Sequence, residues 1–338
     1  MVSILFLAII VSFVATYFGL VGWIKKCKNL DLLWEDMNKF GKPKNVAGSG
    51  GIVVIIGFVL GVLTYIALRT FAMGQTDGIN VEIFALLAVI LIVGFMGTVD
   101  DFLDKYKGGL SQWIRIVLAF VASIPLVVIN AGHDSISIPF IGLVNLGLIY
   151  PIILIPLGIA ATTTVYNFLA GFNGLEAGLG MMILTFLSYV AYVHDAAWLA
   201  LIGLCMVVAL FAFWLFNKNP AQVFPGNTLT SAVGALIGGM AILGNFEKVA
   251  VIVFIPFIIE MILKIRGKIE LNNGKWPHSF GEPQKDGGLK LKYGKVYGLT
   301  HFSIWFLSKL KRKVTENDVV YFIYIIEILF ILTAFLML

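Results

Sequence analysis

The chain has 338 residues, of which 59% are hydrophobic and 13% charged, and its mean hydropathy is +0.96. A single soluble core cannot hide so much apolar surface, so lipid must act as the solvent. The net charge of +5 gives no reason to invoke nucleic acid, because no soluble basic domain is present. The two cysteines, Cys27 and Cys205, indicate neither a disulfide framework nor a metal site.

Apolar stretches of about 20 residues, the length that a helix needs to cross a bilayer, recur along the chain. They are centred near residues 12, 60, 90, 121, 156, 186, 205, 236, 256 and 328. The predicted fold is an all-α polytopic membrane protein with about ten transmembrane helices, in a single domain over residues 1–338. The first stretch has no basic residue before it and Lys25 and Lys26 after it, so we interpret it as a retained span and not a cleaved signal peptide.

The basic residues predict the orientation. Alternate loops on one side of the ten spans hold 22 of the 24 lysines and arginines, and only Arg69 and Lys248 fall on the other side. By the positive-inside rule the basic side is cytoplasmic, so we expect a multi-pass cell-membrane protein with both termini on the far side. Lys42, Asp104 and Glu176 are predicted to be cytoplasmic, and Asp77 and His133 to lie on the far side.

Asp100 and Asp101 form the first polar motif, within residues 97–104 at the cytoplasmic end of the third stretch. Adjacent carboxylates repel each other, and keeping both ionised at a membrane boundary is costly without a counter-charge. A metal ion or a cationic neighbour would remove that cost. A solvated acidic loop at a helix end is the alternative.

A second motif, Asn-Phe-Leu-Ala-Gly-Phe-Asn-Gly-Leu-Glu-Ala-Gly at residues 167–178, interrupts a long apolar run. Glycine lets the backbone approach a ligand closely, and asparagine offers neutral groups that suit Mg²⁺ or phosphate-bearing ligands. A glycine-rich turn between helices is the competing interpretation. The third motif, residues 223–230, places Gly-Asn-Thr at the start of the eighth stretch, where helical N–H groups attract anions or are simply capped.

All three motifs fall on the side that holds the basic residues. A site that joins two phosphate-bearing substrates needs a divalent cation and fixed positive charge to screen their repulsion. The largest extramembrane piece, the insertion at residues 265–317 between the ninth and tenth spans, lies on the same side. Its residues 269–276 predict a small hairpin around an Asn-Gly turn. Residues 299–313 predict either an interfacial helix or an amphipathic linker packed on the bundle.

With these motifs the chain resembles the polyprenyl-phosphate N-acetylhexosamine-1-phosphate transferase family (glycosyltransferase family 4) over nearly its whole length, from Asp36 onward. The run at residues 167–178 is the most specific match. The bacterial muramoyl branch carries aspartates where this chain has Ala170 and Asn173. The chain is therefore more similar to the UDP-GlcNAc:dolichyl-phosphate GlcNAc-1-phosphate transferases and their archaeal relatives.

The resemblance implies an enzyme that moves a sugar-1-phosphate, GlcNAc-1-phosphate in the dolichol branch, from a UDP-sugar to a polyprenyl phosphate. UMP is released, and the product is the first lipid intermediate of glycan assembly, such as that of N-glycans. Mg²⁺ is the expected cofactor, with Mn²⁺ as an alternative ion. The expected partners are the two substrates and the bilayer, and a homodimer is left open.

The family also implies roles for particular residues. By resemblance, Asn167 contacts Mg²⁺, while Gly171 and Phe224 sandwich the uracil. Backbone groups near Met37 and Asn173 are expected to read the edge of that base. These five positions define the expected nucleotide site.

Asp100 and Asp101 match an aspartate pair beside the lipid phosphate and the pyrophosphate, and either is a candidate to remove a residual proton or to orient metal-bound water. Arg115 stands where relatives place a pyrophosphate-binding lysine. His278 and His301 lie in a loop that contributes basic residues to sugar and phosphate recognition. A solvated loop histidine is the alternative for each.

Departures from the family pattern affect the expected metal binding and sugar recognition. Asn227 stands where the family has a Mg²⁺-ligating aspartate, so we expect weaker metal binding, or a simple helix cap. His278 lacks the flanking arginines of the dolichol enzyme, having Pro277 and Ser279 instead. Lys44 occupies the region where that enzyme has a glutamate.

Two other classes of protein compete with this interpretation. A transporter should place ionisable groups near the bilayer midplane, where only Glu260 and Glu327 are candidates, and both are expected to face the bundle interior. An inactive relative that scaffolds other enzymes gains support from Asn227.

Overall fold

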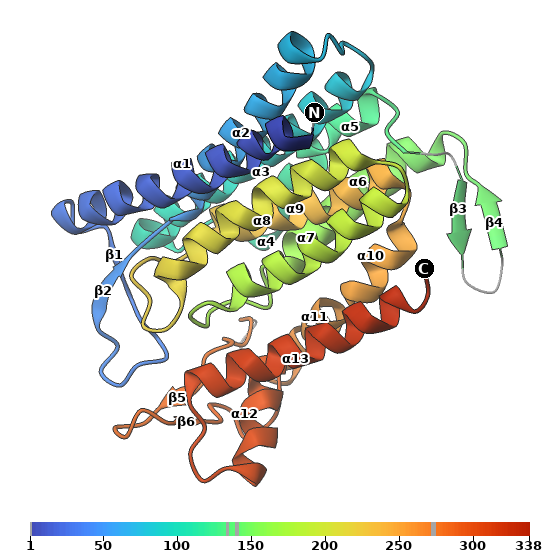
Figure 1. The fold of residues 1–338 in the computed structure, drawn as a ribbon. Helices are drawn as coiled ribbons and strands as arrows, with labels where there is room; N and C mark the ends of the chain where they lie inside the picture. The colour runs from blue at the N-terminus through green and yellow to red at the C-terminus, as the bar shows by residue number, and fades with distance from the viewer. Residues whose placement is uncertain (1, 133–134, 139–141, 272–274) are drawn as a thin grey trace.

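The computed structural model describes residues 2–132, 135–138, 142–271 and 275–338, and its chain forms a bundle of long helices (Figure 1). The helices are α1 (Val2–Asn29), α2 (Gly51–Ala67), α3 (Ile79–Lys107), α4 (Gln112–Ala122), α5 (Ile124–Val128), α6 (Ile155–Tyr166), α7 (Leu175–Val193), α8 (Ala197–Asn217), α9 (Gly226–Gly244), α10 (Glu247–Val253), α11 (Ile255–Glu270), α12 (Leu299–Leu310) and α13 (Glu316–Phe335), with π-helical turns η1 (Leu68–Ala72) and η2 (Tyr150–Leu154). The strands form antiparallel pairs: β1 (Leu33–Glu35) with β2 (Lys44–Ala47), β3 (Ser135–Ile138) with β4 (Gly142–Asn145), and β5 (Glu282–Pro283) with β6 (Leu289–Lys290).

Within the described residues, seven helices are long and apolar enough to cross a membrane: α1, α2 with η1, α3, α7, α8, α9 and α13. The remaining predicted stretches are helical too, but each is divided into shorter helices. In each of them a helix or π-helical turn begins with a proline in its first turn, at Pro125, Pro151, Pro156 or Pro256. Proline lacks the N–H that continues a helix, which explains these interruptions. The mostly helical class is confirmed and is consistent with a polytopic membrane protein, and the count of ten spans stays a prediction.

Helix α9 lies at the centre of the bundle and packs against α3, α6 and α7, with most of its side chains buried. The outer helices instead expose large apolar side chains. Phe18 on α1 is 67% exposed and Phe95 on α3 is 71% exposed. Such surfaces suit a lipid surrounding and would be a liability in water.

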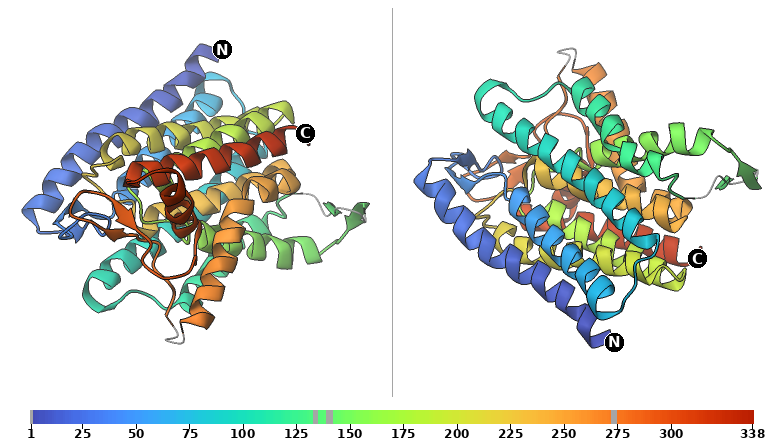
Figure 2. Two further views of the ribbon diagram at one scale, coloured as in Figure 1. Left: turned by 90° about the horizontal axis from the view of Figure 1, so that it is seen from below. Right: turned by 90° about the horizontal axis from the view of Figure 1, so that it is seen from above.

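The two ends of the bundle differ. The hairpins β1–β2 and β5–β6 and helix α12 gather at one end, while β3–β4 and both chain termini lie at the other (Figures 1 and 2). The loops that carry the basic residues are therefore grouped as the sequence predicted. His133 lies outside the described residues.

The predicted hairpin at residues 269–276 is wrong in its location. Ile269 and Glu270 belong to the last turn of α11, and residues 272–274 lie outside the described part of the chain. The hairpin of this insertion is β5–β6 instead. Helix α12 is present as predicted, and it buries one face against α11 and α13 while Leu310 is 67% exposed. The described part of the insertion 265–317 thus contains the end of α11, a short hairpin, α12 and the first residues of α13.

Candidate functional site

A cleft of about 790 Å³ opens at the end of the bundle that carries the basic loops. Pockets of this size hold drug- or cofactor-sized ligands. Its walls come from six chain segments: the β1–β2 region, the end of α3, the break between α6 and α7, the end of α8, the start of α9 and the insertion at Phe280. Six predicted binding residues line it together, as does Asp101: Met37, Asn167, Gly171, Asn173, Phe224 and Asn227.

The α6–α7 break is held in place by buried carboxylates. Glu176 accepts a hydrogen bond from the Gly171 backbone N–H at 2.7 Å, and Glu316 accepts one from the Asn173 N–H at 2.8 Å. The Asn173 side chain donates to Asp36 at 3.0 Å. Hydrogen bonds to charged acceptors are stronger than neutral ones, so the backbone here has a fixed shape.

The opposite wall of the cleft carries Phe224. Its N–H donates to the Ala47 carbonyl at 2.8 Å, and its own carbonyl accepts from the Gly50 N–H at 2.9 Å. Asn217, at the end of α8, accepts from the Gly174 N–H at 3.0 Å and donates to the Val223 carbonyl at 2.8 Å. Asn217 therefore fixes the spacing between the two walls.

Asp101 caps helix α9 from a neighbouring helix. One carboxylate oxygen accepts from the Asn227 N–H at 2.6 Å, and the other accepts from the Thr228 hydroxyl at 2.9 Å. Gly226 has φ +69, and a Cβ there would lie 2.1 Å from an Asp101 oxygen, so only glycine fits. Helix N–H groups favour a negative partner, and Asp101 supplies it. The expected alternative, in which the Asn227 side chain caps the helix, is wrong.

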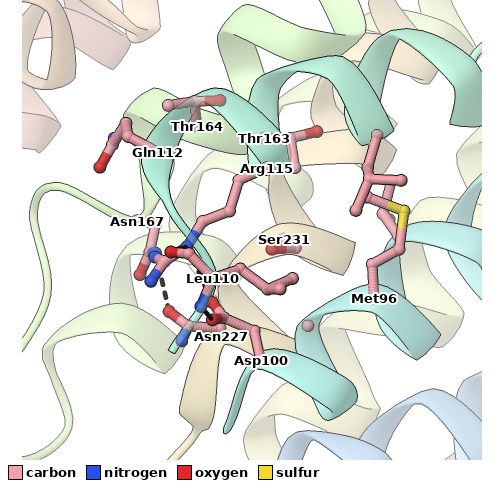
Figure 3. Close-up of a pocket in the computed structure, with 13 residues that line it drawn as sticks. Met96, Asp100, Leu110, Gln112, Arg115, Thr163, Thr164, Asn167, Asn227 and Ser231 are labelled. Carbon is pink, nitrogen blue, oxygen red and sulfur yellow. Dashed lines mark hydrogen bonds and ion pairs between the residues drawn. The ribbon is translucent and has the colours of Figure 1, made fainter. Parts of the chain in front are cut away.

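Asp100 faces a separate, smaller cavity of about 40 Å³, shown in Figure 3. Its carboxylate accepts from the Leu110 N–H at 2.6 Å and forms an ion pair with Arg115 Nε at 2.9 Å. Arg115 Nε also lies 3.2 Å from the Leu110 carbonyl. Asp100 is buried whereas Arg115 is partly exposed, so the guanidinium is oriented by a fixed carboxylate.

Asn167 and Asn227 are the residues common to the cleft and the small cavity. Asn167 Nδ2 donates to Asn227 Oδ1 at 2.8 Å (Figure 3), and Thr230 Oγ1 donates to Asn167 Oδ1 at 3.1 Å. The amide oxygen of each asparagine thus already accepts a hydrogen bond. This pair of side chains forms the boundary between the two spaces.

This donor set does not form a preassembled Mg²⁺ site. Mg²⁺ prefers carboxylate and phosphate oxygens in octahedral geometry, whereas Asn167 and Asn227 offer neutral oxygens that are already in hydrogen bonds. No cluster of three or more His, Cys, Asp or Glu side chains suited to a metal occurs among the described residues. Any cation at this point would need oxygens from a ligand.

The two histidines of the insertion lie in different environments. His278 is exposed, and its ring stacks on Phe280 with centroids 6.1 Å apart. Phe280 lines the cleft, whereas His278 does not. Partial desolvation by neighbouring residues, with the charges of Lys292 and Lys264, lowers the pKa of His278. His301 is fully buried in the first turn of α12 and packs edge-on against Tyr293, so the alternative of a solvated His301 is wrong, and we do not expect it to contact a substrate.

Sequence reasoning missed several buried polar residues that shape the site. They are Asp36, Asn38, Glu176, Asn217, Lys264 and Glu316. Their signal was a polar side chain at the edge of an apolar stretch, because such a group must find a partner when it is buried. The partners come from distant parts of the chain, so the pattern alone did not identify them.

The chain is similar to known proteins of one family. The model of glycosyl transferase family 4 matches residues 83–245. A Saccharolobus solfataricus protein is 35% identical over 298 residues, covering 87% of this chain and 86% of the relative. A Sulfolobus acidocaldarius protein is 33% identical over 330 residues, covering 97% and 94%. Both carry the provisional name UDP-N-acetylglucosamine–dolichyl-phosphate N-acetylglucosaminephosphotransferase, and a Dictyostelium discoideum protein with that name is 27% identical over 273 residues, covering 70% and 65%.

Proposed function

Because the chain belongs to glycosyl transferase family 4, we propose that it transfers GlcNAc-1-phosphate from UDP-GlcNAc to a dolichyl-type polyprenyl phosphate. The substrates follow from the names of the archaeal and Dictyostelium relatives. The product would be a polyprenyl-diphospho-GlcNAc, the first lipid intermediate of a glycan. The basic end of the bundle would face the cytoplasm.

The observation that carries this proposal is the shared boundary between the two spaces. The larger cleft, with Gly171 and Phe224 on its walls, has room for the nucleotide-sugar. The smaller cavity combines Arg115 with apolar residues such as Met96 and Leu118, which suits the phosphate end of a lipid. The two substrates would then meet beside Asn167 and Asn227.

The reaction is written as one phosphoryl transfer. An oxygen of the lipid phosphate attacks the sugar-linked phosphorus, and the bond from that phosphorus to the oxygen bridging the two phosphates breaks. UMP leaves with that electron pair. Because a phosphate monoester loses its second proton with a pKa of about 6, the nucleophile is largely ionised at neutral pH, and the leaving phosphate needs no proton. A general base is therefore not required.

The protein positions the two substrates and neutralises the charge of their phosphates, as phosphoryl transfer requires. We propose that Arg115 contacts the phosphates with its outer guanidinium nitrogens, while Asp100 holds its Nε. Asp101 would fix Asn227 at the boundary through the helix N-terminus. Both aspartates would thus act through neighbours, with their oxygens already engaged.

The test is release of UMP that depends on the lipid acceptor. Purified protein with UDP-GlcNAc, dolichyl phosphate and Mg²⁺ should release UMP, and omission of dolichyl phosphate should abolish the release. Arg115→Gln should lower turnover by about 100-fold, because it removes a positioned charge. Lys248→Gln is the matched control, since it removes a positive charge from an exposed residue in the first turn of α10. No UMP in the complete reaction would reject the proposal.

A further inference from the structure

Residues 277–281 of the insertion form one edge of the cleft. Phe280 lines the cleft beside Gly171. The two are in close contact, because a Cβ on Gly171 would lie 2.8 Å from the Phe280 ring. His278 stacks on the outer side of the same ring. The position of this short segment therefore decides how the cleft is bounded next to Gly171.

A buried lysine on α11 holds the segment in place. Lys264 Nζ donates to the Ser279 hydroxyl at 2.7 Å and to the Pro277 carbonyl at 3.1 Å. Its side chain is only 8% exposed, and it lies 3.8 Å from Glu260 Oε1, whose side chain is fully buried. Glu260 in turn accepts from the Leu299 N–H at 2.5 Å. One ion pair therefore connects α11, the segment and the start of α12.

A second anchor acts from the front. Asn38 donates to the Gly171 carbonyl at 2.8 Å and accepts from the Gly281 N–H at 3.3 Å. Ser279 Oγ donates to the Phe168 carbonyl at 3.4 Å. The segment is thus attached to both the β1–β2 region and the α6–α7 break, on either side of Phe280.

We propose that Lys264 is a positioning residue for recognition of the UDP-sugar donor, acting through residues 277–281 and not through contact with the substrate. A buried ammonium group is costly unless it is paired and hydrogen-bonded. Here its donors are directed at the two residues that flank His278. The inference rests on the proposed function, because it assigns Lys264 to the donor side of that reaction.

The test compares Lys264→Met with Lys268→Met. Lys268 lies one turn further along α11, is partly exposed and stacks on Trp276, so it has the same chemistry without the anchor. Lys264→Met should raise the KM for UDP-GlcNAc by about tenfold, since buried partners lose their donor. The KM for dolichyl phosphate, the turnover at saturation and all constants of Lys268→Met should stay within about threefold of the parent.

A double-mutant cycle with Phe280→Ala separates positioning from general stabilisation. If Lys264 acts through the segment, Lys264→Met should add little to the donor KM once Phe280 has been removed. The inference would be overturned if the effects of the two substitutions on the donor KM multiplied in the double variant. Equal rises in both KM values, or a lowered melting temperature with an unchanged donor KM, would also overturn it. If Lys264→Met does not fold, Ser279→Ala takes its place in the same comparison. Absence of UMP release by the parent protein would instead reject the proposed function.

Discussion

At the scale of single residues, two neighbouring aspartates face different parts of the site. Successive residues of an α-helix point about 100° apart, because 3.6 residues make a turn. Asp100 accordingly reaches Arg115 and the small cavity, whereas Asp101 reaches the N-terminus of α9 and lines the cleft. The sequence predicted a counter-charge for the pair, and Arg115 provides one for Asp100.

Replacing either aspartate with asparagine should cut turnover by at least about 100-fold, in line with the loss of a positioned charged group. Asp100→Asn should lower turnover because Arg115 loses the carboxylate that orients it. Asp101→Asn should lower turnover because Asn227 is no longer held in place. Turnover in detergent, with melting temperature as the control for folding, measures both. Activity within about threefold of the parent in both variants would remove the pair from the mechanism.

The side chain of Asn227 leads to a prediction about the affinity of the site for a divalent cation. Because its amide oxygen is neutral and already accepts from Asn167, the protein without donor should bind a divalent cation weakly. Asn227→Asp adds a carboxylate, which hard cations prefer. We expect tighter Mn²⁺ binding without substrate, measured by electron paramagnetic resonance, and a lower Mg²⁺ concentration for half-maximal activity. Superimposable titrations of the two proteins would mean that position 227 does not face the metal.

His301 predicts a pH dependence of stability. Burial, with smaller contributions from Lys264 and Lys292, lowers the pKa of His301 to about 4, below the ordinary histidine value of about 6.5. The folded state thus favours the neutral ring, so its stabilising effect is complete above about pH 6.5 and is lost as the pH falls toward 4.

His301→Gln should therefore show a smaller fall in melting temperature between about pH 7 and pH 5 than the parent, because a glutamine does not titrate. The matched control is His194→Gln, an exposed histidine at the opposite end of the bundle, which should behave like the parent. Equal falls in all three proteins would show that His301 does not control acid stability.

At the scale of elements, the apolar stretches predicted where helices lie, since a window of about 20 residues is long enough for the pattern to be clear. The short hairpins were harder to predict from the sequence. Leu33–Glu35 and Lys44–Ala47 pair across an eight-residue gap, which is longer than an ordinary hairpin loop of about 2–5 residues. The Asn-Gly turn favoured a hairpin at residues 269–276 instead. In the insertion, α11 continues through Ile269 and Glu270, where the first strand was expected.

The candidate site was predictable in part for the same reason. The motifs at Asp100, Asn167 and Gly226 break long apolar runs and so are visible in one sequence. Asn38 and Lys264 lie in ordinary polar or basic surroundings, and their importance depends on contacts with residues more distant in the chain. Only the folded chain reveals those contacts.

At the scale of the whole molecule, the grouping of basic loops at one end predicts orientation. Cysteines at positions 42 and 104 should react with an impermeant reagent from the cytoplasmic side, and one at position 77 only from the far side. The native Cys27 and Cys205 are buried and would be replaced by alanine in the background. Labelling of positions 104 and 77 from the same face would contradict the topology.

The positions of the two buried glutamates and of the cavities argue against the transporter alternative. Glu260 and Glu327 are fully buried within the bundle, as predicted. Glu260 is paired with Lys264 and anchors the insertion. The cleft and the small cavity both lie at one end of the bundle, among the basic loops, which suits a reaction at a membrane surface better than passage across the membrane.

In transfer of a sugar-1-phosphate, phosphorus travels with the sugar. UDP-GlcNAc labelled with ³²P in the sugar-linked phosphate, incubated with the purified protein, dolichyl phosphate and Mg²⁺, distinguishes sugar-1-phosphate transfer from sugar transfer. We predict that the label enters the lipid extract in step with release of unlabelled UMP. Label that stays in the aqueous phase as UDP while GlcNAc enters the lipid would contradict the account, as would intact donor after prolonged incubation.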